Sequence, residues 1–160
     1  MKEINIGAAG FVYENINELS DIDKNLMEAA IEATKKSYAP YSGFKVGAAL
    51  LMEDDSIITG NNQENAAYPS GMCAERVAIW KAGSSFPNKK VIKIAITAIS
   101  SNKIVDKPVG PCGACRQTLL EYEINQAKDV EVIFMGQIGK VVKANSISSL
   151  LPFSFDSSYL

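Results

Sequence analysis

The chain has 160 residues, 16 Lys and Arg against 18 Asp and Glu, a formal net charge of −2, and no histidine. This length suits one domain that buries a core without disulfides, and the near balance of charge argues against a polynucleotide-binding surface. Without an imidazole, Ser-His-Asp and Cys-His catalysis, histidine-ligated zinc and a histidine general base are excluded. Any proton carrier must therefore be another group, most simply a carboxylate.

The cysteines are odd in number, since the chain has three. Together with the lack of an export signal, this argues against a disulfide framework and leaves free thiols, catalytic thiols or metal ligands. The longest apolar stretch, Val46 to Met52, is far too short to cross a membrane. We therefore expect a cytoplasmic protein without a membrane partner.

Residues 1–19 alternate weakly between apolar and polar and indicate a loose N-terminal extension with one edge strand. We expect residues 20–160 to form a single domain. Its first helix is predicted from the N-cap Ser20 to near Tyr38, because acidic residues fill the first turn and apolar residues recur at helical spacing. The following Ala39 precedes a proline and is disfavoured in a helix.

After this helix, short apolar segments bounded by turn residues predict a hairpin of two strands, followed by a polar loop from Asn61 to Ser70. This loop either binds a ligand or is a solvated connection. A helix should then begin at Cys73 and end at Gly83, and a second helix should run from Cys112 to Tyr122. The expected strands are 46–52, 57–59, 91–99, 130–135 and 141–142, with a short helix at 146–151.

Helices alternating with strands indicate an α/β fold, a three-layer α/β/α arrangement around a mixed sheet of about five strands. Both cysteine motifs follow a strand and a loop and open a helix. The dipole and the free N–H groups at a helix N-terminus favour thiolates. The two motifs therefore stand where metal ligands or reactive thiols are expected.

Three cysteines fit a catalytic zinc site, which takes three protein ligands and keeps a fourth position for water or substrate. Cys112 and Cys115 can bind one ion from a single helical turn, and Cys73 can complete the set if the two helix starts meet. Glu75 can reach a water at such an ion, take its proton and return it to a leaving group. Three cysteines with a non-ligand glutamate are typical of zinc deaminases.

Arg76 and Arg116 are the two arginines of the chain, and each directly follows a motif. We expect their guanidinium groups to bond the ligand sulfurs and offset part of their charge, although two surface arginines would also fit. A thioredoxin-like dithiol at Cys112 and Cys115 is an alternative, but it leaves Cys73 and Glu75 unexplained. A structural zinc module for nucleic acid lacks a fourth ligand and a basic face.

The chain resembles the small cytidine deaminase family from about residue 38 to residue 155, through four segments: 38–48, 62–68, 73–76 and 111–117. The resemblance implies a zinc-dependent hydrolase of pyrimidine salvage that converts cytidine and 2′-deoxycytidine to the uridines and releases ammonia. It further implies one zinc per chain on Cys73, Cys112 and Cys115, Glu75 as the proton shuttle, and a homotetramer with composite sites.

The same resemblance implies the substrate contacts. Phe44 would pack on the pyrimidine, Asn62 and Glu64 would bond the sugar hydroxyls, and the N–H of Ala74 would contact the base. The residues implied to reach a neighbouring subunit's site are Ala66, Tyr68 and Phe155. The Glu64 carboxylate would repel a phosphate, which favours nucleosides over nucleotides and nucleic acids.

A blasticidin-type deaminase is the nearest rival, because it shares the zinc motifs. It is expected to lack the segment that contains Asn62, Glu64 and Asn65.

Overall fold

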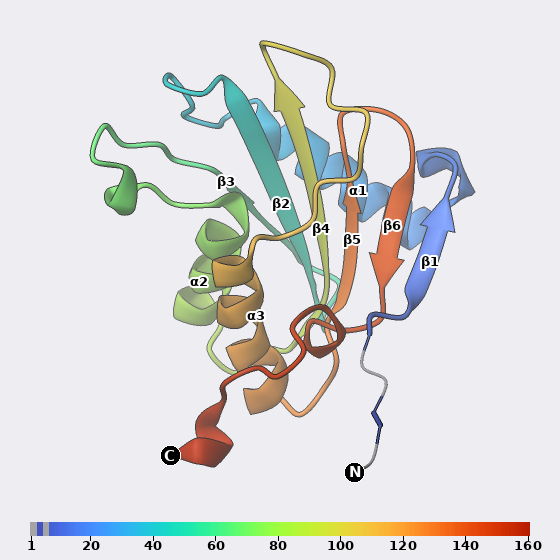
Figure 1. Cartoon of the computed structure of the whole chain (residues 1–160), viewed down its shortest axis with the longest axis vertical. Helices are drawn as coiled ribbons and strands as arrows, with labels where there is room; N and C mark the ends of the chain where they lie inside the picture. Colours follow the sequence, from blue (N-terminus) through green and yellow to red (C-terminus); the bar gives the residue numbers. More distant parts are fainter. Residues whose placement is uncertain (1–2, 5–6) are drawn as a thin grey trace.

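The computed structural model describes residues 3–4 and 7–160, which form a six-stranded mixed sheet with helices on both faces (Figure 1). In spatial order the strands are β1 (Gly10–Tyr13), β6 (Val141–Ala144), β5 (Glu131–Met135), β4 (Val91–Ser100), β2 (Phe44–Met52) and β3 (Ile57–Asn61). The strands β4 and β5 are parallel and all other neighbours are antiparallel. The predicted α/β class is confirmed, with one strand more than about five.

The helix α1 (Asp21–Thr34) covers one face of the sheet, and α2 (Ala74–Ser85) and α3 (Gly113–Asn125) cover the other (Figure 1). Short 3-10 helices are η1 (Ile16–Glu18), η2 (Tyr68–Ser70), η3 (Ser148–Leu150) and η4 (Ser157–Tyr159). Within residues 3–4 and 7–160, none of the helices has both the length and the apolar character that a bilayer span requires.

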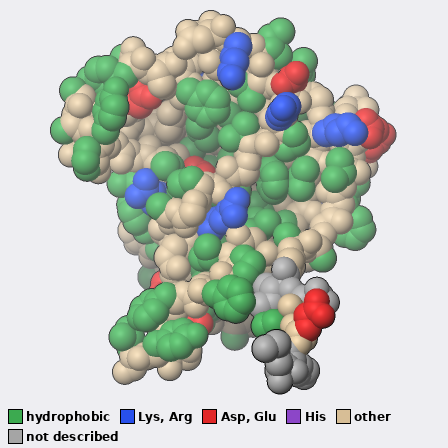
Figure 2. Space-filling view, viewed as in Figure 1, with side chains coloured by type: hydrophobic (Ala, Val, Ile, Leu, Met, Phe, Trp, Pro, Cys, Tyr) green, Lys and Arg blue, Asp and Glu red, His purple; other side chains and the backbone are tan. Residues whose placement is uncertain are grey.

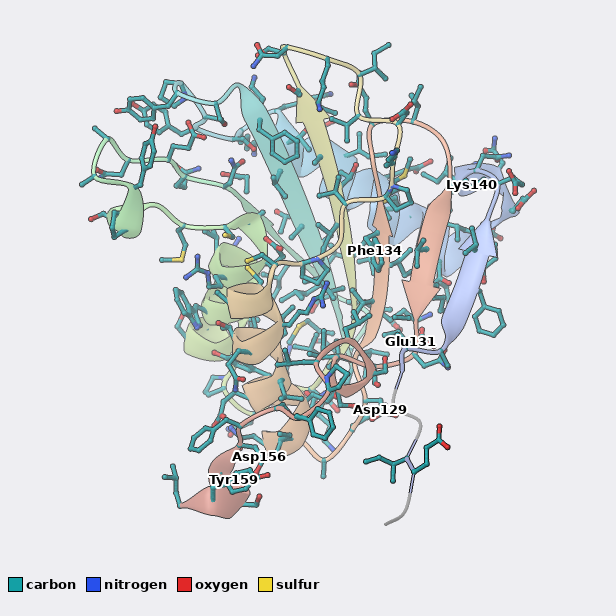
Figure 3. The ribbon with its side chains drawn as sticks, viewed as in Figure 1. Asp129, Glu131, Phe134, Lys140, Asp156 and Tyr159 are labelled. Carbon is teal, nitrogen blue, oxygen red and sulfur yellow. The ribbon has the colours of Figure 1, made fainter. Side chains whose placement is uncertain are left out.

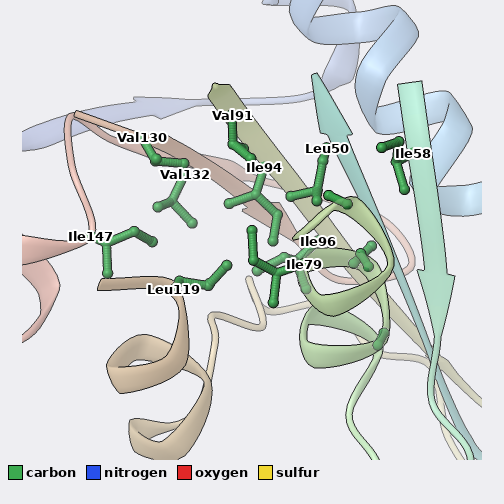
Figure 4. Close-up of a cluster of buried hydrophobic side chains, with 14 of the residues drawn as sticks. Leu50, Ile58, Ile79, Val91, Ile94, Ile96, Leu119, Val130, Val132 and Ile147 are labelled. Atoms are coloured by element: carbon green, nitrogen blue, oxygen red, sulfur yellow. The ribbon is translucent and has the colours of Figure 1, made fainter. Parts of the chain in front are cut away.

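The sheet separates two hydrophobic cores because successive side chains of a strand point to opposite faces. On β4, Ile94 and Ile96 pack with Ile79 of α2 and Leu119 of α3 (Figure 4). The residue between them, Ala95, belongs to the cluster under α1. A strand buried on both faces is almost continuously apolar, which explains why residues 91–99 are a clear strand in the sequence.

Residues 7–19 add an edge to the sheet. The strand β1 pairs antiparallel with β6, so the predicted edge strand is confirmed. The N-cap is also confirmed, because the Ser20 hydroxyl accepts a hydrogen bond from the Asp23 N–H at 3.2 Å. Residues 1–2 and 5–6 of the expected N-terminal extension lie outside the described residues.

The first helix ends at Thr34, so the predicted end near Tyr38 is wrong. Tyr38 instead lies beside the polar loop, where its N–H donates to the Asn62 carbonyl at 3.0 Å and its own carbonyl accepts from Glu64 N–H at 2.8 Å. These two backbone bonds to a distant segment hold residue 38 in an extended conformation.

The predicted end of the second helix at Gly83 is also wrong, since α2 continues to Ser85. A Cβ atom at Gly83 would lie only 2.6 Å from the Tyr122 hydroxyl oxygen of α3. The glycine therefore serves the packing of α2 on α3. A second close approach occurs at Gly60 of β3, where a Cβ atom would lie 2.5 Å from the Ala74 carbonyl oxygen and 2.5 Å from the Ala78 nitrogen.

A cluster of paired charges fastens α1 to the sheet. The Asp23 carboxylate accepts from Lys93 Nζ at 2.7 Å and from Lys143 Nζ at 3.0 Å. Glu131 Oε2 lies 2.8 Å and 3.2 Å from the same two nitrogens. The cluster thus balances two carboxylates with two ammonium groups, as buried charges require.

Glu123 of α3 is a buried carboxylate that binds three backbone N–H groups. Its Oε2 accepts from Val130 at 2.9 Å and from Ile147 at 2.8 Å, and its Oε1 accepts from Ser148 at 2.9 Å. These bonds join α3 to the start of β5 and to η3. No sequence motif pointed to this residue.

Candidate active site

The N-termini of α2 and α3 bring the three cysteines together. Cys73 is the N-cap of α2, Cys112 is the N-cap of α3, and Cys115 is buried in the first turn of α3. All three are free, and their sulfurs lie within 4.8 Å of one another. Tetrahedral zinc with bonds of about 2.3 Å separates its sulfurs by about 3.8 Å, so a small contraction would place them around one ion. The cysteine triad therefore fits a single metal.

The surroundings of Cys73 favour its thiolate form. The pKa of Cys73 is lowered to about 5, because the Cys115 thiol and the Arg76 guanidinium donate hydrogen bonds to its sulfur. The pKa of Cys115 is raised by its bond to Cys73 and by burial. The opposite shifts reflect a hydrogen bond between the two sulfurs, and this proximity suits the replacement of thiol protons by a metal ion.

The two arginines make different contacts. Arg76 Nη2 donates to Cys73 Sγ at 3.3 Å, which is the bond to sulfur that its position suggested. Arg116 instead donates from Nε to the Pro111 carbonyl and from Nη1 to the Leu150 carbonyl, both at 2.8 Å. Arg116 therefore holds the backbone next to Cys112 and the backbone of η3 by hydrogen bonds.

Glu75 lies in the first turn of α2 and is 5% exposed. Its pKa is raised, chiefly because burial disfavours the charged carboxylate and also because of the negative charge at Cys73. The carboxyl group faces the cavity that Cys73 and Cys112 also line. A buried carboxyl beside a metal site is suited to carrying protons.

The cavity has a volume of about 550 Å³, which is in the range of small-molecule sites. It brings together eight of the residues that the sequence indicated: Phe44, Asn62, Glu64, Tyr68, Cys73, Glu75, Arg76 and Cys112. Ala74 is buried between Cys73 and Glu75. The sequence reasoning missed Ile96 and Val109 of the wall, and Tyr41 and Ser42, which lie within the segment 38–48 that carried the family resemblance.

The polar side chains on the sugar side of the expected site are bonded to the backbone. Asn62 Oδ1 accepts from the Val46 N–H at 2.8 Å, and its Nδ2 donates to the Phe44 carbonyl at 2.9 Å. Glu64 Oε2 accepts from the N–H groups of Tyr41 at 2.9 Å and Ser42 at 3.3 Å, and its Oε1 accepts from the Ser42 hydroxyl. The Ser42 hydroxyl and then the Tyr41 N–H hold the pKa of Glu64 below its ordinary value.

The residues implied to reach a neighbouring subunit lie on the surface, and Tyr68 is the one of them that also lines the cavity. Tyr68 is 76% exposed, and its ring centre is 6.4 Å from that of Tyr41 at the cavity wall. Ala66 is exposed in the same loop. Phe155 is 59% exposed, stacks on Tyr159 at 5.5 Å and accepts from Gln117 Nε2 of α3 through its carbonyl at 2.8 Å.

Figure 3 shows Tyr159 near the C-terminus, below α3, and Figure 2 shows hydrophobic side chains gathered over this C-terminal segment.

A cavity at an α/β sheet that combines a three-cysteine metal site with a buried carboxyl group indicates a metal-dependent enzyme that acts on small molecules. A family model described as the cytidine and deoxycytidylate deaminase zinc-binding region matches residues 20–130. The chain is 42% identical over 130 residues to the cytidine deaminase of Halalkalibacterium halodurans, covering 81% of this chain and 91% of that relative. It is also 36% identical to the probable cytidine deaminase of Dictyostelium discoideum, covering 84% of each.

Solved structures of cytidine deaminases are also similar to this chain. The cytidine deaminase of Burkholderia pseudomallei superposes with a TM-score of 0.72 at 37% identity, over 86% of this chain and all of that one. The cytidine deaminase of Mycobacterium tuberculosis superposes with a TM-score of 0.66 at 28% identity, over 86% and 99%. The chain belongs to the cytidine and deoxycytidylate deaminase family, which identifies zinc as the metal for the cysteine triad.

Proposed function

We propose that the protein hydrolyses cytidine and 2′-deoxycytidine to uridine and 2′-deoxyuridine and releases ammonia. The observation that carries the proposal is the placement of the buried Glu75 beside the cysteine triad, at one cavity of nucleoside size. The cytidine deaminases to which the chain is similar, at up to 42% identity, support this substrate.

Zinc held by Cys73, Cys112 and Cys115 would supply a Lewis acid that activates water at neutral pH. Glu75 takes one proton of the attacking water and delivers it to N3 of the base. The water oxygen forms the new bond to C4. Glu75 then carries the second proton of the water to the amino group, the C4–N bond breaks, and ammonia leaves. Both protons of the water are thereby accounted for.

The cavity wall can hold the nucleoside on two sides. In this proposal Phe44, which lines the cavity, packs on the pyrimidine, and the N–H of the buried Ala74, at the start of α2, contacts the base. Asn62 and Glu64 form the sugar side, where Asn62 also fixes the backbone of Phe44. Because the Glu64 carboxylate is ionised, a phosphate on this side is repelled and free nucleosides are favoured over nucleotides and nucleic acids.

Residues 20–160 constitute the deaminase domain in this proposal, and residues 1–19 are an extension whose strand β1 forms the sheet edge. The assembly is a homotetramer, in which the exposed Ala66, Tyr68 and Phe155 of one chain reach the cavity of another. The enzyme works in pyrimidine salvage. Its three free thiols suit the reducing cytoplasm, where metal ligands stay reduced.

The test is the change in ultraviolet absorbance when the zinc-loaded protein acts on cytidine, with blasticidin as the comparison substrate. We expect turnover of cytidine and about one zinc per chain by metal analysis. Zinc-loaded protein that leaves cytidine unchanged would overturn the proposal. Active protein that holds much less zinc would favour dithiol chemistry at Cys112 and Cys115.

A further inference from the structure

The Ser42 hydroxyl lies between two walls of the cavity. It donates a hydrogen bond to Glu64 Oε1 on the sugar side and accepts one from the Phe44 N–H, at 2.9 Å, on the base side. One hydroxyl group therefore connects the side chain expected to meet the sugar with the residue expected to meet the base.

The bonds to Glu64 use most of its capacity as an acceptor. An ionised carboxylate offers about four lone-pair directions and no donor. Oε2 takes the N–H groups of Tyr41 and Ser42, whereas Oε1 takes only the Ser42 hydroxyl. The free acceptor direction is thus on Oε1, the oxygen that Ser42 holds. A sugar hydroxyl can donate to it, but a group without a proton to donate cannot.

Residue 42 is itself held from outside the cavity. Asn102 Nδ2 donates to the Ser42 carbonyl at 3.1 Å, and the Ser101 N–H donates to the Gly43 carbonyl at 3.0 Å. Gly43 has a φ angle of 64°, a conformation that favours glycine. The backbone of this turn therefore does not depend on the bond between Ser42 and Glu64.

We propose that Ser42 is a positioning residue that holds Oε1 of Glu64 as a fixed acceptor for a sugar hydroxyl. The proposal rests on the proposed function and deepens it. It makes a nucleoside with a hydroxylated pentose the preferred substrate, and it assigns this preference to a residue outside the direct sugar contacts.

The kinetic test compares Ser42→Ala with the wild type as full-length, zinc-loaded enzymes. With cytidine we expect the KM of Ser42→Ala to rise about tenfold, the effect of losing one hydrogen bond to a charged group, and kcat to stay within about twofold. With 2′,3′-dideoxycytidine, which has no hydroxyl at either position, the KM should change less than about twofold. Ser42→Thr keeps the hydroxyl and should restore the KM for cytidine.

The matched control is Asn102→Ala, which removes the outer contact of the same turn and leaves the Ser42 hydroxyl in place. Asn102→Ala should leave the ratio of the KM for cytidine to the KM for 2′,3′-dideoxycytidine as it is in the wild type. An equal rise of KM for both nucleosides in Ser42→Ala would show that Ser42 acts through Phe44 or the turn alone, and unchanged values would show no role. Either result overturns the proposal.

A second measurement needs no turnover. Carbon-13 NMR of the Glu64 carboxyl should give a higher pKa in Ser42→Ala than in the wild type, since the hydroxyl is the largest cause of the lowered value. An unchanged pKa would contradict the contact. A wild-type enzyme that fails to deaminate cytidine would overturn the proposed function, and the NMR comparison would still decide whether Ser42 holds Glu64.

Discussion

Replacement of Glu123 by alanine should destabilise the fold without touching the cavity. The substitution leaves three N–H groups without their acceptor, at Val130, Ile147 and Ser148, of which the first two residues are at most 1% exposed. An unsatisfied buried donor costs about 1–3 kcal/mol. Because water can reach the less buried Ser148, we expect a loss of about 3–5 kcal/mol in the free energy of unfolding.

Glu123→Gln should cost less. The amide oxygen can replace Oε2 and keep its two donors, but the NH₂ group then faces the Ser148 N–H. The loss of one hydrogen bond and the contact between two donor groups should lower the free energy of unfolding by about 2 kcal/mol. The expected order of stability is therefore wild type, Glu123→Gln, Glu123→Ala.

Urea unfolding of the zinc-loaded protein at one fixed protein concentration measures both losses. The control is Glu121→Ala on the same helix, because Glu121 is exposed and, among residues 3–4 and 7–160, its side chain accepts only from that of Asn125, at 3.1 Å. Its effect should stay within about 0.5 kcal/mol. A loss below about 1 kcal/mol for Glu123→Ala, or one equal to that of the control, would refute the reasoning.

Glu75→Gln should keep about one zinc per chain and lose turnover, as metal analysis and steady-state kinetics would show; normal turnover would remove this carboxyl group from proton transfer. Arg76→Ala loses the bond to the Cys73 sulfur and should weaken zinc binding about 10- to 100-fold in a chelator competition, whereas the exposed control Lys81→Ala should not. Equal zinc affinities would contradict this role. Burial raises the pKa of Asp23, but its two lysine partners outweigh burial and leave the pKa below the ordinary 3.8. The stability that ionised Asp23 contributes is complete above its ordinary pKa and is lost as the pH falls through the lower pKa of the folded state. The thermal midpoint should therefore fall less steeply with decreasing pH in Asp23→Asn than in the wild type. Equal slopes for the two proteins would contradict this role of Asp23.

The chemistry of the site was predictable because it depends on local spacing. Cys112 and Cys115 lie within one turn, Glu75 lies two residues beyond Cys73, and both motifs open a helix. Only the meeting of the two helix starts required the fold, because the sequence left it as a condition for Cys73 to complete the metal site.

The contacts of the polar side chains were not predictable, because their partners are backbone groups of distant segments. Asn62 bonds the backbone of Phe44, and Glu64 bonds the backbone of Tyr41. Arg116 bonds the carbonyl of Pro111, just before its helix, and that of Leu150 in η3. A residue's type tells which bonds it can make, but only the fold tells which backbone groups lie within reach.

The role of Gly83 also depends on a distant segment and was not predictable from the sequence. In the sequence Gly83 has the features of a helix end, and only the Tyr122 ring of another helix reveals why the residue is small. Tyr38 is similar, since its extended conformation beyond the helix depends on backbone bonds to Asn62 and Glu64.

The close approach at Gly60 has a consequence for the metal. The first turn of α2 rests on this glycine, so the height of Cys73 above the sheet is set by the absence of a side chain on β3. Cys112 and Cys115 are carried by a different helix, α3. One methyl group at residue 60, which lies outside the cavity wall, would therefore push the start of α2 away from the sheet and change the position of the Cys73 sulfur.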